Sequence, residues 1–193
     1  MRKLSSLGLS LGLLLSTAPA FAHPGHDLAD AGFIAGLLHP LLGIDHLLAM
    51  LVVGIWAAQI GGRARVWVPM SFLTVMAFGA CCAFNGYTPP RIEAGIAASL
   101  MVLGLFCANA WRMRLSTAMG ITGAFAFYHG AAHGSELPLL AQPLAFASGF
   151  LVSTTVLHLT GLLIGTLALR HSHWLARLCG VAVLATGVAY SFA

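Results

Sequence analysis

Charged side chains are scarce in this sequence: they make up 7% of its 193 residues, and only five residues are acidic. A soluble domain carries roughly 25% charged residues. Hydrophobic residues make up 59% of the chain, and the mean hydropathy is +0.92. The chain has too few polar residues to cover a water-facing surface, so we expect it to lie in a lipid bilayer.

Basic residues are also few, and they are scattered along the chain rather than gathered in a patch. The formal net charge is only +4. Domains that bind nucleic acid concentrate Lys and Arg on one face or along one helix. The sequence therefore argues against a nucleic-acid partner.

Cysteine is present in small number, and every cysteine falls inside an apolar segment rather than in an exported loop. This pattern does not indicate the disulfide framework of a small secreted protein. We expect small packing residues, with a metal or redox site at the adjacent pair as the alternative. The cysteines are Cys81, Cys82, Cys107 and Cys179.

Residues 1–22 have the three parts of a secretory signal peptide. Arg2 and Lys3 form the charged start, a short apolar core follows, and Ala20 and Ala22 give the small-residue pattern before a cleavage site. We expect cleavage after Ala22, which leaves residues 23–193 as a single transmembrane domain. The alternative is an uncleaved first helix.

Six apolar segments after the leader approach the ~20 residues that a helix needs to cross a bilayer. They cover residues 40–60, 67–84, 92–111, 115–133, 144–169 and 175–193. The sequence therefore predicts an all-α, polytopic membrane protein with six transmembrane helices. Six spans divide into two sets of three, so an inverted 3+3 arrangement, common in transporters, is possible.

Arginines in the loops orient these spans. With an exported N-terminus, only Arg91 lies on an outer loop, which is the bias of the positive-inside rule. The arginines expected inside are Arg63, Arg65, Arg112, Arg114 and Arg170. We expect a protein of the bacterial inner membrane, with both ends of the mature chain outside.

The segment before the first span, residues 27–38, is weakly amphipathic. We expect a short helix on the outer surface, followed by a spanning helix whose first residue is Pro40, where the missing N–H is harmless. The alternative is one long helix from about residue 30, kinked at Pro40.

The stretch HPLLGIDH, from His39 to His46, places ionisable groups at the outer end of the first span. A carboxylate at this depth, that of Asp45, needs a partner, a water-filled cavity or a bound cation. Asp45 and His46 can touch one ion at the helix edge. His39 lies ~10 Å from His46 along a regular helix, so the two can share an ion only if the helix is broken. A gate, a cap or a second site is the expected role of His39.

The stretch FYHGAAHGSE, residues 127–136, carries a second polar cluster. His129 and His133 share one helix face, and Glu136 extends that face by almost one turn. A histidine pair at this spacing is a good bidentate site for a transition metal. The predicted topology puts this cluster at the same depth as the first one. Imidazole and carboxylate together suit Ni²⁺, Co²⁺ or Zn²⁺ better than Mg²⁺ or Ca²⁺.

Three further histidine positions are candidates for handling metal. His158 lies in the middle of the fifth span, where Thr154 and Thr155 can orient its ring or continue a polar path inward. His23 and His26, at the mature N-terminus, can capture metal outside the membrane. His171 and His173 lie in an inner loop that we interpret as solvated and basic.

The two motifs, with the leader and the six spans, resemble the HupE/UreJ family over essentially the whole chain. The resemblance implies a permease for nickel, and in some members cobalt, that accompanies hydrogenase or urease maturation. It also implies that the metal is handled by His39, Asp45, His46, His129, His133 and Glu136.

We therefore expect a membrane permease for a divalent transition-metal ion, with Ni²⁺ as the expected ion, and not an enzyme. The chain has no phosphate-binding loop of the G-x-x-x-x-G-K-[ST] type. Its partners would be the bilayer, the ion and maturation proteins, with Ni²⁺ or Co²⁺ as cargo and no permanently bound cofactor. Two alternatives keep the same histidines: a haem-binding electron carrier, and a metal sensor or chaperone that does not transport.

Overall fold

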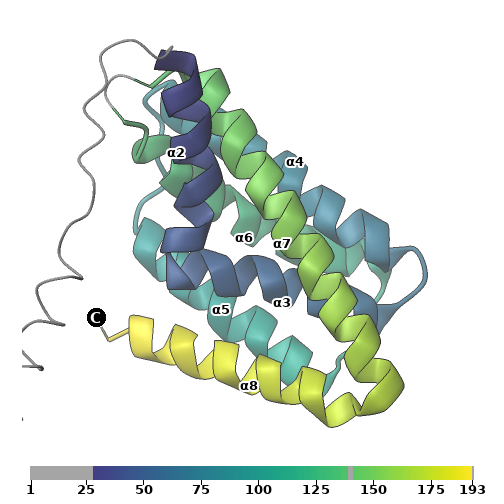
Figure 1. Cartoon of the computed structure of the whole chain (residues 1–193). Helices are drawn as coiled ribbons and strands as arrows, with labels where there is room; N and C mark the ends of the chain where they lie inside the picture. Colours follow the sequence, from purple (N-terminus) through teal and green to yellow (C-terminus); the bar gives the residue numbers. More distant parts are fainter. Residues whose placement is uncertain (1–27, 139–140, 193) are drawn as a thin grey trace, which may run out of the picture.

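The computed structural model describes residues 28–138 and 141–192 (Figure 1). The expected leader, His23 and His26 lie outside the described residues. All secondary structure in the described part is helical, which confirms the all-α class. The helices are α2 (Leu28–Leu42), α3 (Ile44–Ile60), α4 (Ala64–Phe84), α5 (Ile92–Asn109), α6 (Leu115–Ser135), α7 (Pro143–His171) and α8 (His173–Tyr190).

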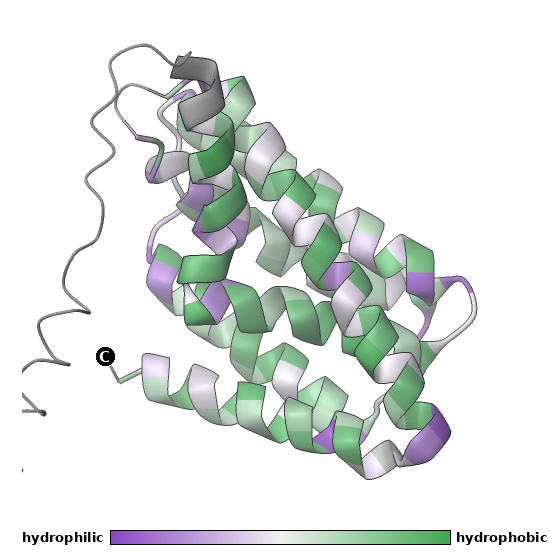
Figure 2. Ribbon diagram, in the orientation of Figure 1, coloured by the Kyte–Doolittle hydropathy of each residue, from purple (hydrophilic) through white to green (hydrophobic). Residues whose placement is uncertain are grey.

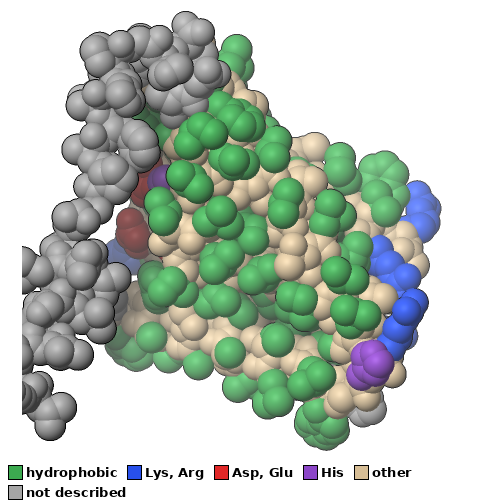
Figure 3. All heavy atoms as spheres, in the orientation of Figure 1, with side chains coloured by type: hydrophobic (Ala, Val, Ile, Leu, Met, Phe, Trp, Pro, Cys, Tyr) green, Lys and Arg blue, Asp and Glu red, His purple; other side chains and the backbone are tan. Residues whose placement is uncertain are grey.

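Hydrophobic residues predominate along the helices in the view of Figure 2, and hydrophilic ones gather at helix ends and at the bend between α2 and α3. Large apolar side chains such as Leu42, Leu144 and Leu159 are exposed. This surface suits lipid and not water. On the face seen in Figure 3, Lys and Arg gather along one edge, and Asp and Glu lie at the opposite edge.

Three helices of the described part are long and apolar enough to cross a membrane: α4, α5 and α7. The bent pair α2 and α3 adds a fourth if it forms one span. The apolar part of α8, Trp174–Tyr190, is shorter. By length and composition these helices are candidate membrane spans, consistent with a membrane protein, and the count of six crossings stays a prediction.

The chain bends by 79° between α2 and α3, at Gly43. The expectation that Pro40 begins the spanning helix is wrong, because Pro40 lies inside α2, in its last turn. A proline here withholds its own N–H from the carbonyl one turn earlier and crowds that turn, which weakens the last turn of α2. At Gly43 an added Cβ would lie 2.8 Å from Asp45 Oδ1, so a larger residue here would force the Asp45 carboxylate to shift.

The helices pack in defined pairs: α7 lies along both α2 and α3, α4 lies against α6, and α5 lies against α8. If α2–α5 form one half and α6–α8 the other, α3 corresponds to α6, α4 to α7 and α5 to α8. The α3–α7 pair of one half then corresponds to the α4–α6 pair, and the α5–α8 pair corresponds to itself. This pairing is what two related repeats of three spans produce, and it supports the 3+3 arrangement.

Glycines at equivalent positions lie at the contacts of the two related helix pairs, α3–α7 and α4–α6. A Cβ on Gly130 would strike the carbonyl of Met76 across α4–α6, and one on Gly54 would strike that of His158 across α3–α7. Gly79 faces Phe127, and Gly161 faces Leu51, in the same register. Small residues let helix backbones approach closely, so these glycines serve the packing of the helices.

The cysteines differ in their surroundings. Cys107 is buried and donates its thiol hydrogen to Ala176 O at 3.3 Å, as expected of a packing residue. Cys81 is exposed, so for that residue the expectation of packing is wrong. All four thiols are free, in agreement with the absence of a disulfide framework.

Candidate metal centre

Four histidine rings from three helices meet beside the α2–α3 bend. The ring centre of His46 lies 4.6 Å from that of His133 and 4.9 Å from that of His129. The ring centre of His39 lies 4.9 Å from that of His133 and 6.2 Å from that of His46. The two sequence motifs therefore form one cluster, as their predicted common depth required.

The position of His39 corrects the expectation from a regular helix. That expectation separated His39 from the ion at Asp45 and His46 unless the helix was broken. The helix is broken at Gly43, and the bend folds His39 back onto the cluster. Distance therefore no longer separates His39 from the cluster, and it gives no reason to assign His39 to a gate, a cap or a second site.

Asp45 fixes the orientation of His46. Its Oδ1 lies 2.9 Å from His46 Nδ1 and accepts the backbone N–H of His46 at 2.8 Å. Since a carboxylate only accepts, Nδ1 carries the hydrogen, and in a neutral ring Nε2 then offers a lone pair. His46 Nε2 is buried and has no hydrogen-bond partner. Asp45 thus acts on His46 as carboxylates act on metal-binding histidines in many proteins.

Ser99 on α5 fixes His129 in the same way. The Ser99 hydroxyl donates to Ile96 O at 2.7 Å, so its oxygen accepts from His129 Nε2 at 2.9 Å. His129 Nδ1 is then the lone-pair nitrogen, and it is buried without a partner. Sequence reasoning missed Ser99, although a serine inside an otherwise apolar span was a usable signal.

His133 is held by stacking instead of hydrogen bonding. Its ring lies parallel to Phe150 of α7, with ring centres 4.8 Å apart and an angle of 11° between the planes. Both ring nitrogens are buried and unpartnered. Buried nitrogens without partners are costly, so these three histidines need an explanation that the hydrogen bonds of the described residues do not supply.

Glu136 caps the end of α6 and reaches His39, whose Nε2 donates to Glu136 Oε2 at 2.7 Å. This hydrogen bond lowers the pKa of the Glu136 carboxyl, although partial burial opposes the shift. The expectation that Glu136 extends the His129–His133 face is thus replaced by a contact with His39. The side chain of Glu136 is half exposed, so the pair faces the surface.

A cavity of about 190 Å³ leads from the surface to these histidines. Both carboxylates line it, so its mouth attracts cations. It is lined by His39, Leu42, Gly43, Asp45, His46 and Glu136. His129 and His133 are fully buried and contact His46 and His39 at its inner wall.

The four rings pack mainly edge to face. Within residues 28–138 and 141–192, no three His, Cys, Asp or Glu side chains already stand in the geometry that holds a metal ion. His46, His129 and His133 nevertheless each have a buried ring nitrogen without a partner, and ion binding would require these rings to rotate toward one point.

His158 lies apart from the four-histidine cluster. Its Nδ1 is 2.8 Å from Met50 O, and Phe72 contacts the rings of both His158 and His129. The expectation that Thr154 or Thr155 orients His158 is wrong. Thr155 donates to Leu151 O, and Thr154 donates to a methionine sulfur. Met50 and Phe72 gave no signal in the sequence, because their roles depend on packing between distant helices.

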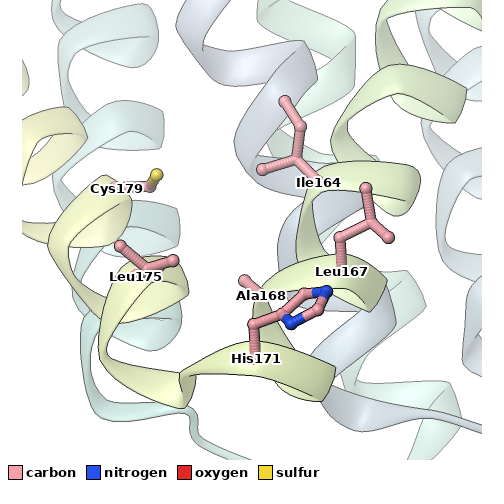
Figure 4. A pocket seen from close by; sticks show the side chains of 6 residues that line it. All are labelled: Ile164, Leu167, Ala168, His171, Leu175 and Cys179. Carbon is pink, nitrogen blue, oxygen red and sulfur yellow. The ribbon is translucent and has the colours of Figure 1, made fainter.

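His171 lies at the far end of α7 and is exposed. It lines an apolar cavity of about 250 Å³ between α7 and α8. In Figure 4 its ring lies beside Leu167 and Ala168, and Cys179 stands on the facing helix. This surrounding is apolar, and it offers no second metal cluster within the described residues.

Comparison with known proteins covers nearly the whole chain. The family description "HupE / UreJ protein" matches residues 11–190. "Protein HupE" from Rhizobium leguminosarum bv. viciae is 38% identical over 190 residues, which are 97% of each chain. No solved structure matches this chain. The chain, with its two polar motifs joined at one helix bend, belongs to the HupE/UreJ family.

Proposed function

We propose that this protein is a membrane permease that imports a divalent transition-metal ion, Ni²⁺ above all, for the maturation of a hydrogenase- or urease-type enzyme. The observation that carries the proposal is the meeting of His46, His129 and His133. Each of the three rings has a buried nitrogen without a partner, and the rings lie behind a cavity lined by two carboxylates. Imidazole is a good ligand for Ni²⁺ and Co²⁺.

In the proposed mechanism, Asp45 and Glu136 draw the ion into the cavity and offset its charge. His39 and His46 replace part of its water, and His129 and His133 complete the exchange of ligands. Asp45 and Ser99 act through His46 and His129 by keeping one lone pair free on each ring. The ion is cargo, and no enzymatic step or resident cofactor is part of the proposal.

The path and topology follow from the sequence predictions. We place the cavity on the outer side of the bacterial inner membrane, with six crossings and both ends of the mature chain outside. His23 and His26 would capture metal before it enters. His158, beyond Phe72, would take the ion toward the inner side, where the exposed Arg63, Arg65 and Arg170 lie. The preference for nickel over cobalt rests on family membership, because both ions accept these ligands.

Uptake of ⁶³Ni²⁺ into liposomes that contain the purified full-length protein tests the proposal. Uptake should occur with wild type, fall to background with His129→Ala and fall strongly with Asp45→Asn. It should persist with the control His171→Ala, which removes an exposed histidine outside the cluster. Equal uptake by wild type and His129→Ala would refute the site.

Two other outcomes correspond to the alternative functions. Ni²⁺ binding without flux would indicate a sensor or chaperone. A Soret band at stoichiometric haem in the purified protein would indicate an electron carrier. The structure gives no observation that favours either one.

A further inference from the structure

His158 is a buried histidine with one free lone pair. Its side chain is 2% exposed, and its Nδ1 lies 2.8 Å from Met50 O. A carbonyl oxygen only accepts, so Nδ1 carries the hydrogen, and the neutral ring has its lone pair on Nε2. His158 Nε2 has no hydrogen-bond partner. An acceptor left unpaired in the protein interior is costly, and it needs an explanation.

Two methionine sulfurs lie beside Thr154, which is one turn before this histidine on the same helix. Thr154, one turn before His158 on α7, is fully buried and donates its hydroxyl hydrogen to Met50 Sδ at 3.1 Å. Met76 Sδ lies 4.0 Å from the same hydroxyl oxygen. Met50 therefore contacts His158 through its carbonyl and Thr154 through its sulfur. Met50 and Met76 come from α3 and α4, and neither is accessible to solvent.

These side chains lie at the middle of their helices and one aromatic ring beyond the metal centre. Phe72 contacts His129, with ring centres 5.6 Å apart, and His158, with ring centres 5.1 Å apart. His158 also lines a cavity of about 190 Å³ between α4 and α7, and Arg65 lines the same cavity. The group thus stands between the four-histidine cluster and the end of the bundle that carries Arg65.

We propose that Met50, Met76 and His158 form a second metal-binding station, built of two thioethers and one imidazole, in the centre of the helix bundle. This inference rests on the proposed function, because it assigns a relay to the ion that the four-histidine cluster would admit. Thr154 is a positioning residue that holds the sulfur of Met50.

The chemistry of this set explains what such a station would add. Thioether and imidazole donors suit late transition metals and serve Mg²⁺, Ca²⁺ and Mn²⁺ poorly. The set contains no carboxylate, so it leaves the charge of the ion unbalanced and holds it weakly. Conduction requires sites that an ion can leave as well as enter. The station therefore rejects hard cations that pass the carboxylate-lined mouth, and it releases the selected ion.

Selenium absorption spectroscopy tests the station directly. The full-length protein is produced with selenomethionine and loaded with excess Ni²⁺, and the selenium edge is searched for a nickel neighbour. We expect a Ni–Se scattering path that disappears in Met50→Leu/Met76→Leu and persists in the control Met101→Leu/Met119→Leu. Leucine has nearly the volume of methionine, so packing is kept. Because the signal is read in the unsubstituted chain, it decides the question even if a variant does not fold.

Liposome flux supplies the second measurement. Ni²⁺ uptake should fall roughly tenfold or more in Met50→Leu/Met76→Leu, in the range that loss of groups around a metal produces. It should be unchanged in the control pair. If wild type moves no Ni²⁺, the proposed function fails. If wild type moves Ni²⁺ but shows no Ni–Se path, or if the folded double variant transports normally, only this inference is overturned.

Discussion

The ring centres of His39 and His46 lie 6.2 Å apart, although a regular helix would place residues at this spacing ~10 Å apart along its axis. The break at Gly43 makes the difference. It also brings the Glu136 carboxylate, on another helix end, into contact with His39. The proposed metal centre therefore depends on a backbone feature as much as on the side chains proposed as its ligands.

Substitution of Gly43 should damage the centre without removing a ligand. In Gly43→Ala the new Cβ would lie 2.8 Å from Asp45 Oδ1, so Asp45 must move and His46 loses its support. We expect Ni²⁺ affinity to fall roughly tenfold or more, as with other losses of support around a metal. Titration calorimetry measures it. Gly120→Ala is the control, since a Cβ there meets nothing within 4 Å, and equal affinities in the two variants would contradict the role of the bend.

Loss of the Ser99 hydroxyl should weaken metal binding through His129. Ser99→Ala removes the acceptor of His129 Nε2–H, so the ring can turn or change tautomer. We expect an affinity loss of roughly 10–100-fold in Ni²⁺ titrations. Ser148→Ala removes a hydroxyl that makes the same kind of backbone bond on an exposed face, and it should bind like wild type. A Ser99→Ala protein with wild-type affinity would remove Ser99 from the site.

The two carboxylates should differ in their effects. Asp45 supports a buried ring, whereas Glu136 is half exposed and pairs with His39 near solvent. Exposed ion pairs contribute only about 0–1 kcal/mol, so Glu136→Gln should lower Ni²⁺ affinity no more than a few-fold. Its main effect should be slower uptake that loses its salt dependence. Asp45→Asn should cost much more affinity at any ionic strength, and the reverse order would contradict these assignments.

Glycine contacts between helices should control stability separately from metal binding. In Gly161→Ala the added methyl group meets the backbone of Leu51, so we expect a destabilisation of roughly 1–3 kcal/mol from overpacking. Thermal unfolding in detergent measures it. Gly120→Ala should instead gain about 0.5–1 kcal/mol, since alanine favours a helix. A neutral Gly161→Ala would show that α3 and α7 do not lie so close.

The sequence was most informative where structure is local. His129 and His133 share a helix, so their common face followed from helical spacing, and both are buried together as that spacing predicts. The family resemblance is also confirmed. Pro40 was misplaced because proline fits the first turn of a helix, and only the packing of α2 on α7 shows that the helix continues through it.

Contacts between distant segments could not be predicted in the same way. The partner of His158 is a backbone carbonyl on α3, and every residue has one, so no sequence pattern marks it. The nearby Thr154 was a reasonable expectation, but its hydroxyl is satisfied by sulfur instead. Stacking of Phe150 on His133 likewise depends on how α7 lies against α6.

The correspondence between the two halves of the bundle does not extend to the side chains of the four-histidine cluster. In the register that the glycine contacts define, the counterparts of His46, His129 and His133 are Thr122, Val53 and Ala57. None of these is a good ligand for a transition metal. The related helix pairs therefore give the bundle two similar halves, and the four-histidine cluster is a feature that one end of the bundle carries and the equivalent positions of the other half lack.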